Sequence, residues 1–191
     1  GSYRPFCVLW CAVSDGELTE IPRGTIVVYR EWYGSTGEPN VGLKLTAEEV
    51  AEGIKSRESE TIGYGVIDPA AFAQDGGPSI AERMARAGVT FRRADNARVA
   101  RSGALGGWDH LRSRLKGEEG KPALLMFATC RHLIRTLPAL QHDPDRPEDV
   151  DTDGEDHAPD TLRYACMSRP WVRTLPQVEK PKWPLDLPIA E

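Results

Sequence analysis

Residues 149–164, with the sequence DVDTDGEDHAPDTLRY, are the stretch on which the fold and function of this chain depend most. Six carboxylates fall between residues 149 and 160, and a helical pattern follows directly. Carboxylates packed this densely repel one another, so the folded state needs a positive charge beside them. A divalent cation is the natural partner, because hard cations prefer oxygen ligands. The stretch therefore predicts a metal site, and two kinds of site compete for it.

The first kind is a calcium-binding loop. Its ligand and turn positions would fall on Asp149, Asp151, Asp153, Gly154 and Asp160. However, residues 142–148 contain two prolines and do not suit an entering helix. The eighth position, usually apolar, is Asp156, and Pro159 directly precedes the last ligand. The sequence also contains no second loop of this kind, so the pattern argues against a calcium-binding loop.

The second kind uses the end of the stretch. Asp156 precedes the final helix and Asp160 lies one turn further on, so their spacing puts both on one helix face. A helix N-terminus favours negative charge and helps to keep both carboxylates ionised. The same helix would pack on a sheet through Leu162, Ala165, Cys166 and Met167. The plainer alternative makes Asp156 an N-cap and Asp160 a solvated partner of Arg163.

Asp68 is the third candidate ligand. It ends the short apolar strand of residues 62–67, and Pro69 holds it in an extended conformation. Ligand sites in α/β sheets collect at such strand ends, although a turn-capping role is the alternative. If the final helix lies beside this strand, Asp68 meets Asp156 and Asp160. Such a group can hold two Mg²⁺ or Mn²⁺ ions about 3.5–4 Å apart, for phosphodiester hydrolysis. Asp153 and Asp151 are alternate ligands if their loop folds back.

The order of elements predicts the fold class. The expected strands are residues 6–13, 25–32, 62–67, 89–92 and 123–128. The expected helices are residues 46–59, 79–87, 108–115, 130–137 and 158–168. Thr46 with Glu49 forms a capping box, and Thr129 is the expected cap of the fourth helix. A hairpin followed by alternating units predicts an α/β fold, a mixed sheet with helices on both faces.

Composition limits the possibilities further. The 191 residues suit one sizeable domain, residues 1–169, followed by a proline-rich extended tail, residues 170–191. No apolar run approaches the roughly 20 residues that span a bilayer. The four cysteines and four histidines lack zinc-finger spacing. We therefore expect buried thiols in a reducing compartment.

The charge distribution suggests a polyanion as ligand. Nine basic residues and two acids lie between residues 83 and 116, whereas nine acids and one base lie between 141 and 160. A basic band beside an acidic cluster fits a protein that binds nucleic acid and acts on it with metal, although two solvated faces are the plainer alternative. The candidate phosphate contacts are Arg92, Arg93, Arg98, Arg101, Arg112 and Arg114.

Two motifs in this order resemble a known family. GYGVIDPAAF at residues 63–72 and EDHAPDTLRYA at residues 155–165 are similar to the carboxyl-terminal nuclease domain of tailed-bacteriophage large terminase subunits. Residues 1–6 and 28–33 are also similar, and the resemblance covers most of residues 1–169. It implies a ribonuclease H-like fold and a metal-dependent endonuclease that cuts double-stranded viral DNA in the host bacterial cytoplasm during packaging.

The resemblance also implies partners and a departure from the family pattern. The partners are double-stranded DNA, the portal, the small terminase subunit and an ATPase domain of the same longer chain, with no membrane. This sequence has no phosphate-loop motif of its own. The family carries its first catalytic Asp on the first strand, and we expect that residue just upstream of Gly1. Asp15 and Glu31 are poor substitutes, so we expect this chain by itself to bind the metal pair poorly.

Two alternatives stay open. One is another nuclease of the same fold, of the junction-resolvase or transposase type, which would prefer branched DNA to linear duplex. The other is a non-catalytic docking module, in which the acidic cluster and the proline-rich tail bind portal or capsid protein. Metal-dependent nicking would separate the nucleases from the docking module.

Overall fold

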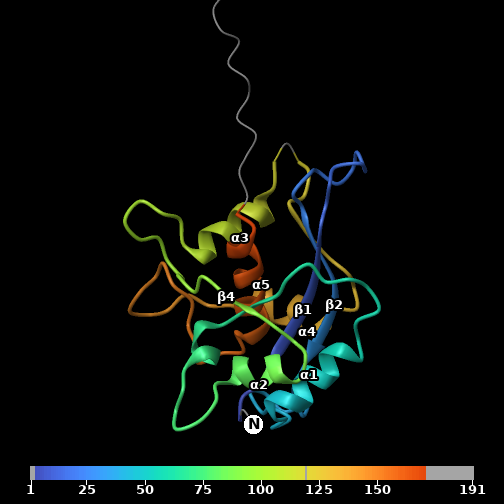
Figure 1. Ribbon diagram of the computed structural model, residues 1–191. Coiled ribbons are helices and arrows are strands. Elements are labelled where there is room, and N and C mark those ends of the chain that lie inside the picture. The colour runs from blue at the N-terminus through green and yellow to red at the C-terminus, as the bar shows by residue number, and fades with distance from the viewer. Residues whose placement is uncertain (1–2, 119, 171–191) are drawn as a thin grey trace, which may run out of the picture.

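An antiparallel hairpin and one later strand form the larger sheet of the protein. The computed structural model describes residues 3–118 and 120–170 (Figure 1). β1 (Cys7–Val13) pairs with β2 (Ile26–Tyr33), with a bulge between Trp10 and Cys11. β5 (Leu124–Met126) joins the other edge of β2 in parallel, giving the order β1-β2-β5. This confirms the predicted hairpin and the mixed sheet.

A second, two-stranded sheet forms separately. β3 (Val66–Ile67) pairs in parallel with β4 (Arg92–Arg93). Both strands are shorter than predicted, and the described strands form two sheets rather than one. Gly65 explains part of this local geometry, because the ring of Phe91 lies 2.6 Å from where a Cβ on Gly65 would stand. β3 therefore needs glycine before it to approach the segment that leads into β4.

The helices follow the predicted order. They are α1 (Ala47–Lys55), α2 (Ile80–Arg86), α3 (Gly107–Lys116), α4 (Arg131–Thr136) and α5 (His157–Ser168), with short 3₁₀ turns η1 (Pro69–Phe72) and η2 (Leu137–Ala139). The capping box of Thr46 and Glu49 is confirmed, and Ser79 with Glu82 forms a second one before α2. Each box satisfies backbone N–H groups that the first helical turn leaves unpaired.

The predicted cap of α4 is wrong. Cys130, not Thr129, is the N-cap residue, and its side chain makes no capping hydrogen bond. Instead, the Glu31 carboxylate on β2 accepts hydrogen bonds from the backbone N–H groups of His132 at 2.9 Å and Leu133 at 2.7 Å. A neighbouring strand thus provides the negative charge that the start of this helix favours.

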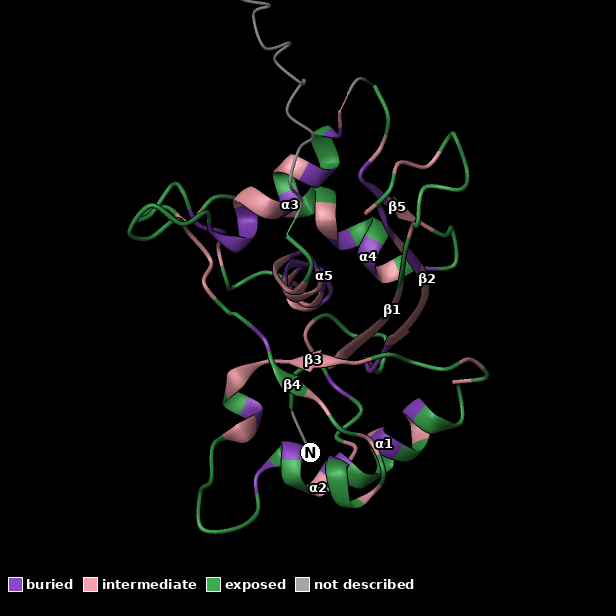
Figure 2. Ribbon diagram, turned by 45° about the horizontal axis from the view of Figure 1, so that its top comes forward, coloured by how far each residue is buried: buried purple, intermediate pink, exposed green. Residues whose placement is uncertain are grey.

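Two hydrophobic clusters lie on opposite sides of β1. Leu9 and Cys11 pack against the larger cluster, which contains residues of β2, β5, α3, α4 and α5. Trp10 belongs to the smaller cluster, which contains residues of α1 and α2 and contacts Ile67 of β3. Figure 2 shows α5 near the centre of the molecule, with α3 and α4 on one side of it and β3, β4, α1 and α2 on the other. The continuous apolar run of β1 is explained, because helices cover both faces of the sheet.

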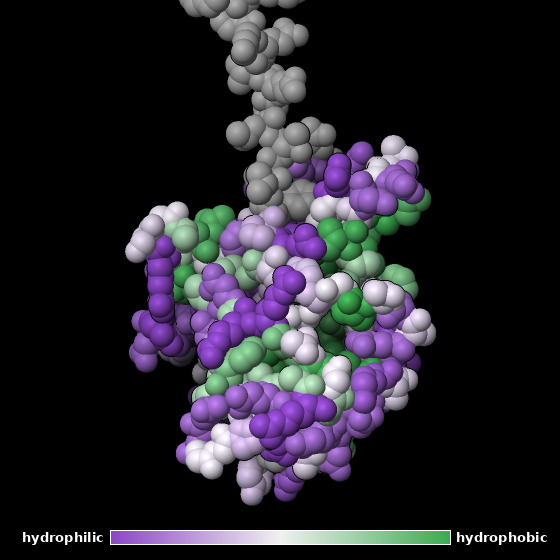
Figure 3. All heavy atoms as spheres, viewed as in Figure 1, coloured by the Kyte–Doolittle hydropathy of each residue, from purple (hydrophilic) through white to green (hydrophobic). Residues whose placement is uncertain are grey.

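One face of the surface shows separate apolar and hydrophilic regions (Figure 3). On the face in Figure 3, a band of apolar side chains crosses the middle of the molecule, with hydrophilic surface above and below it. None of the helices in the described segments is long and apolar enough to cross a bilayer. Of the predicted proline-rich tail, residues 171–191 lie outside the described residues.

Candidate functional site

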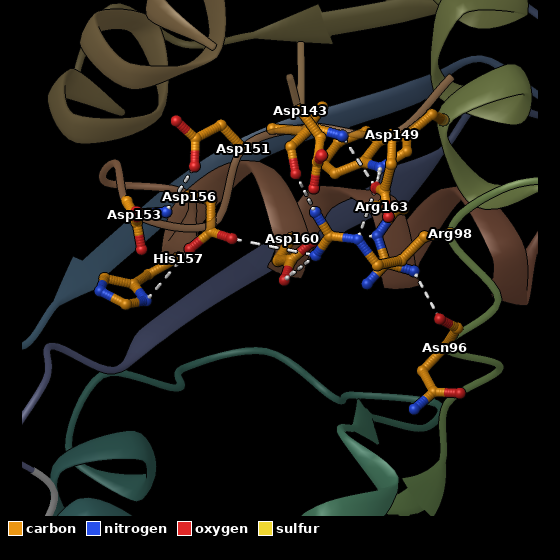
Figure 4. A network of polar contacts seen from close by, with 12 residues as sticks. Asn96, Arg98, Asp143, Asp149, Asp151, Asp153, Asp156, His157, Asp160 and Arg163 are labelled. Atoms are coloured by element: carbon orange, nitrogen blue, oxygen red, sulfur yellow. Dashed lines mark hydrogen bonds and ion pairs between the residues drawn. The ribbon is translucent and has the colours of Figure 1, made fainter. Parts of the chain in front are cut away.

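The acidic stretch has a counter-charge from within the chain. The Nε atom of Arg98 donates to Asp149 Oδ1 at 2.7 Å, and its Nη1 lies 3.5 Å from Asp160 Oδ2 and 3.9 Å from Asp156 Oδ2 (Figure 4). Its Nη2 also donates to the carbonyl oxygen of Val150 at 2.9 Å. One guanidinium therefore bridges three of the six carboxylates, and charge-assisted hydrogen bonds of this kind are strong.

Asp149 is a buried structural residue rather than a calcium ligand. Besides Arg98, its Oδ1 accepts hydrogen bonds from the Trp108 indole at 3.0 Å and from the backbone N–H of Val150 at 2.8 Å. Burial acts to raise the pKa of Asp149, but these hydrogen bonds outweigh burial and hold the pKa below its ordinary value. Through these hydrogen bonds to Oδ1, Asp149 holds the acidic loop against α3.

The middle of the calcium-like pattern forms a local turn. Asp151 Oδ1 accepts a hydrogen bond from the backbone N–H of Asp153 at 2.9 Å, which is an Asx turn. Asp153, a candidate metal ligand, is exposed, and its carbonyl oxygen accepts a hydrogen bond from Asn40 at 3.4 Å. Within residues 3–118 and 120–170, no group of three or more His, Cys, Asp or Glu residues could hold a metal ion.

Asp156 and Asp160 do share one face at the start of α5. Asp156 is buried and stands at the N-cap position, but its side chain makes no capping hydrogen bond. Arg98 Nη1 lies 3.9 Å from its Oδ2, and the His157 imidazole, whose pKa burial lowers, lies 3.7 Å from its Oδ1. Burial, and then the negative charge of Asp160, raise the pKa of Asp156 to about 6. Asp156 is therefore a carboxylate short of positive charge, whereas Asp160 is paired with Arg163 at 3.0 Å.

Asp68 reaches the same helix from the other sheet. It directly follows β3 and caps η1, because its Oδ1 accepts a hydrogen bond from the Ala70 backbone N–H at 2.7 Å. Its Oδ2 accepts a hydrogen bond from the hydroxyl of Tyr164, which lies one turn after Asp160 on α5. Burial and this bond to Asp68 raise the pKa of Tyr164. The final helix does lie beside the strand that ends in Asp68, and Tyr164 makes the link.

The chemistry of this group suits a divalent cation in part. Asp156 and Asp160 present carboxylate oxygens, the ligands that Mg²⁺ and Mn²⁺ prefer. The positive charge of Arg98 does not offset the effects of burial and of Asp160 on Asp156. Asp68 contacts the same helix through the hydroxyl of Tyr164, which lies four residues after Asp160. The described residues thus provide a pair of carboxylates and a third on the neighbouring strand end, but these do not by themselves form a group that could hold a metal ion.

The six arginines predicted to contact DNA differ in their burial and in their partners. Arg114, expected to contact DNA, is only 1% exposed and donates to the carbonyl oxygens of Gly24 at 2.9 Å, Ala123 at 3.0 Å and Arg169. In this position it fixes backbone within the fold and does not face a DNA surface, so its predicted role is wrong. Arg98 is committed to the acidic cluster. The exposed candidates are Arg92, Arg93, Arg101 and Arg112.

The sequence does not predict the role of Tyr164, and it predicts Arg163 only as a partner of Asp160. Tyr164 lies four residues after Asp160, and this helical spacing was a usable signal. Arg163 is 1% exposed, and its Nη1 donates to the carbonyl oxygens of Asn96 at 3.1 Å and Ala97 at 3.3 Å. That contact joins α5 to the loop before α3 across more than 60 residues of sequence, and no local pattern indicates it.

Comparison with known proteins gives one clear likeness. No protein-family model matches the chain, and a search of curated proteins finds no match in sequence. The solved structure of the P22 large terminase nuclease domain superimposes with a TM-score of 0.59 over 88% of this chain and 77% of that one, at 19% identity. The chain has the fold of a terminase nuclease domain. At this identity the likeness concerns the fold, and it confirms the predicted α/β, ribonuclease H-like architecture.

Proposed function

We propose that this chain is the nuclease domain of a phage large terminase subunit, a metal-dependent endonuclease that cuts double-stranded viral DNA during genome packaging. The observation that carries the proposal is the contact of Asp68 with Tyr164 of α5. That helix also carries Asp160 in its first turn and Asp156 at its N-cap, and the fold around it is that of a terminase nuclease domain. The likeness to the P22 protein adds to the support, because that protein shares this fold and is itself a nuclease domain of a large terminase.

Each residue of the site would have its own role in the reaction. Asp156 and Asp160 would hold Mg²⁺ or Mn²⁺ together with Asp68, and Asp153 is an alternate ligand if its loop moves. A bound pair of such ions supplies an activated water and positive charge for the leaving oxygen. Tyr164 orients Asp68 by donating to one carboxylate oxygen and leaving the rest of the carboxylate to its other partners. Arg98 keeps the acidic cluster partly neutralised, which lowers the repulsion between its carboxylates.

The wider assignment follows from the same proposal. The substrate is linear double-stranded DNA, and the exposed arginines Arg92, Arg93, Arg101 and Arg112 would contact its phosphates. The portal, the small terminase subunit and an ATPase domain of the same longer chain would be the partners, in the cytoplasm of the host bacterium.

The test is cleavage of plasmid DNA with Mn²⁺, by this chain and by a longer large terminase subunit that contains it. Asp68→Asn and Asp156→Asn should each abolish cutting by the longer subunit while DNA affinity stays nearly unchanged, because these groups act on the reaction and not on the phosphate backbone. Asp145→Asn, at an exposed site in the same acidic region, is the matched control. Undiminished cutting by either active-site variant contradicts the assignment.

A further inference from the structure

Three side chains gather at the carboxyl end of α5, and we call Tyr64, Arg92 and Arg169 the Tyr64 cluster. The Arg92 guanidinium lies 4.9 Å from the centre of the Tyr64 ring, and the Arg169 guanidinium lies 5.2 Å from it. Arg169 Nε also donates to the Tyr64 hydroxyl at 2.8 Å. The three residues come from the segment before β3, from β4 and from the end of α5. Tertiary structure alone brings them together.

Other contacts hold the cluster in place. The Tyr64 hydroxyl lies 3.5 Å from the carbonyl oxygen of Ser168, at the last turn of α5. The carbonyl oxygen of Arg169 accepts a hydrogen bond from the buried guanidinium of Arg114. The backbone that carries Arg169 is therefore fixed on two sides. A ligand would find these cations already positioned, which lowers the entropic cost of binding.

The cluster has excess positive charge. Arg92 and Arg169 are both exposed, and within residues 3–118 and 120–170 neither has a carboxylate at ion-pair distance. By contrast, Arg98 and Arg163 next to the acidic stretch are both paired. Two guanidinium groups over one ring repel each other unless an anion lies between or beside them. The planar guanidinium suits phosphate oxygens, which it can bind through two parallel hydrogen bonds.

The position of the cluster relates it to the candidate nuclease site. The segment from Tyr64 to Asp68 runs along α5, so that Tyr64 meets Ser168 and Asp68 meets Tyr164. Arg169, the C-cap residue of α5, is nine positions after Asp160, which corresponds to roughly 13 Å along the helix axis. Phosphates of one DNA strand advance by about 3.4 Å each along the duplex. The cluster therefore lies along α5 from Asp160, in a position that suits another phosphate of the same DNA.

We propose that the Tyr64 cluster is a phosphate-binding site for duplex DNA, which holds the backbone on one side of the carboxylate site along α5. The choice of DNA as the ligand rests on the proposed function. The proposal adds Arg169 and Tyr64 to the residues that bind DNA, and it gives Arg92 a defined position among them.

The experiment measures binding of the chain to a short fluorescent DNA duplex in EDTA, at a series of salt concentrations. The double variant Arg92→Gln/Arg169→Gln should bind more weakly, and its slope of log K against log salt should be shallower by about 2, because two phosphate contacts are lost. Arg23→Gln/Arg131→Gln removes the same charge from two exposed arginines on the β1–β2 loop and on α4. This control should keep the slope within about 0.5 of the wild type.

The outcomes separate this proposal from the nuclease assignment. An unchanged slope in the Arg92/Arg169 variant, an equal change in both double variants, or no DNA binding by the wild type at low salt overturns the phosphate site. Because EDTA removes metal, none of these results depends on cleavage. Conversely, a chain that binds DNA through the cluster but never cuts it, even within a longer terminase subunit, contradicts only the nuclease.

A second variant tests the arrangement of the cluster without changing its charge. Tyr64→Phe keeps the ring and removes the hydroxyl that accepts from Arg169 and contacts Ser168. It should weaken DNA binding several-fold at one salt concentration and leave the salt slope unchanged. Wild-type affinity in this variant would refute the positioning role of Tyr64. Thermal denaturation of each variant shows that its fold is intact.

Discussion

At the scale of single residues, two carboxylates of one acidic stretch have opposite properties. Asp149 accepts hydrogen bonds from Arg98, Trp108 and its neighbour Val150, and its pKa lies below the ordinary value. Asp156, seven residues later, is also buried, but the Arg98 guanidinium lies 3.9 Å from its carboxylate, and its pKa is raised to about 6. Hydrogen bonds to the ionised form, and not spacing along the chain, decide the difference.

The raised pKa of Asp156 makes a prediction about stability. Between about pH 4 and pH 6 the folded state keeps a proton that the unfolded chain, with its ordinary value of 3.8, releases. The free energy of unfolding should therefore fall as pH rises through this window, by about 1–3 kcal/mol from this group. Asp156→Asn should lose that decrease and be more stable than the wild type at pH 7. Urea denaturation in EDTA across this pH range measures the effect.

The control for this prediction is Asp145→Asn, because Asp145 is exposed in the same acidic region. Its pH dependence should follow that of the wild type. If Asp156→Asn keeps the full decrease in stability between pH 4 and pH 6, another group causes it and Asp156 is ionised throughout.

Among the secondary-structure elements, residues on neighbouring strands provide hydrogen-bond acceptors that short helices lack. α4 has only six residues, and its own N-cap side chain makes no capping hydrogen bond. The Glu31 carboxylate on β2 accepts from two backbone N–H groups in its first turn. The same principle applies to α5, whose first turn carries Asp160 and whose later turns are tied to β3 through Tyr164 and Asp68. Isolated helices of this length are marginal, so tertiary contacts stabilise them.

Removing the Glu31 carboxylate should weaken the packing of α4 on the sheet. Glu31→Ala leaves two N–H groups without their acceptor and should lower the free energy of unfolding by about 1–2 kcal/mol. Glu38→Ala, at an exposed loop position, should have an effect under about 0.5 kcal/mol. Chemical denaturation at neutral pH compares the two. Equal stability of both variants would show that the Glu31 bonds contribute little.

At the scale of the whole molecule, buried arginines join the parts of the fold. Arg163 on α5 donates to Asn96 and Ala97 in the loop before α3, and Arg114 on α3 donates to Gly24, Ala123 and the end of α5. Both arginines are 1% exposed. Their many backbone contacts compensate for the cost of burying a charge. The position of α5, and with it the candidate site, depends on these contacts.

Gly107 provides a test of this packing. A Cβ at Gly107 would stand 2.5 Å from Arg163 Cγ and 2.9 Å from the Ala97 carbonyl oxygen, so Gly107→Ala should push α3 away from α5. The expected loss of stability is about 1–3 kcal/mol. Gly77→Ala is the control, because nothing lies within 4 Å of the Cβ it would add. A melting temperature of Gly107→Ala equal to that of the control would contradict the close packing of these helices.

The sequence by itself determined the features that depend on neighbours a few residues apart. The order of strands and helices, the capping box of Thr46 with Glu49, and the shared face of Asp156 and Asp160 all follow from local hydrogen bonds and from the helical and strand periods. These depend on spacing alone, and spacing is written in the sequence. The α/β class followed from that order of elements.

The packing of distant elements, by contrast, determines which side chains contact the acidic stretch and which contact Asp68. Arg98 pairs with Asp149 from 51 residues away, and Tyr164 reaches Asp68 from 96 residues away. Arg114, one of a run of arginines that looked like a DNA-binding surface, is buried instead. Partners this distant are chosen by how helices and strands pack, because packing decides which charges lose water and which carbonyl oxygens they then meet.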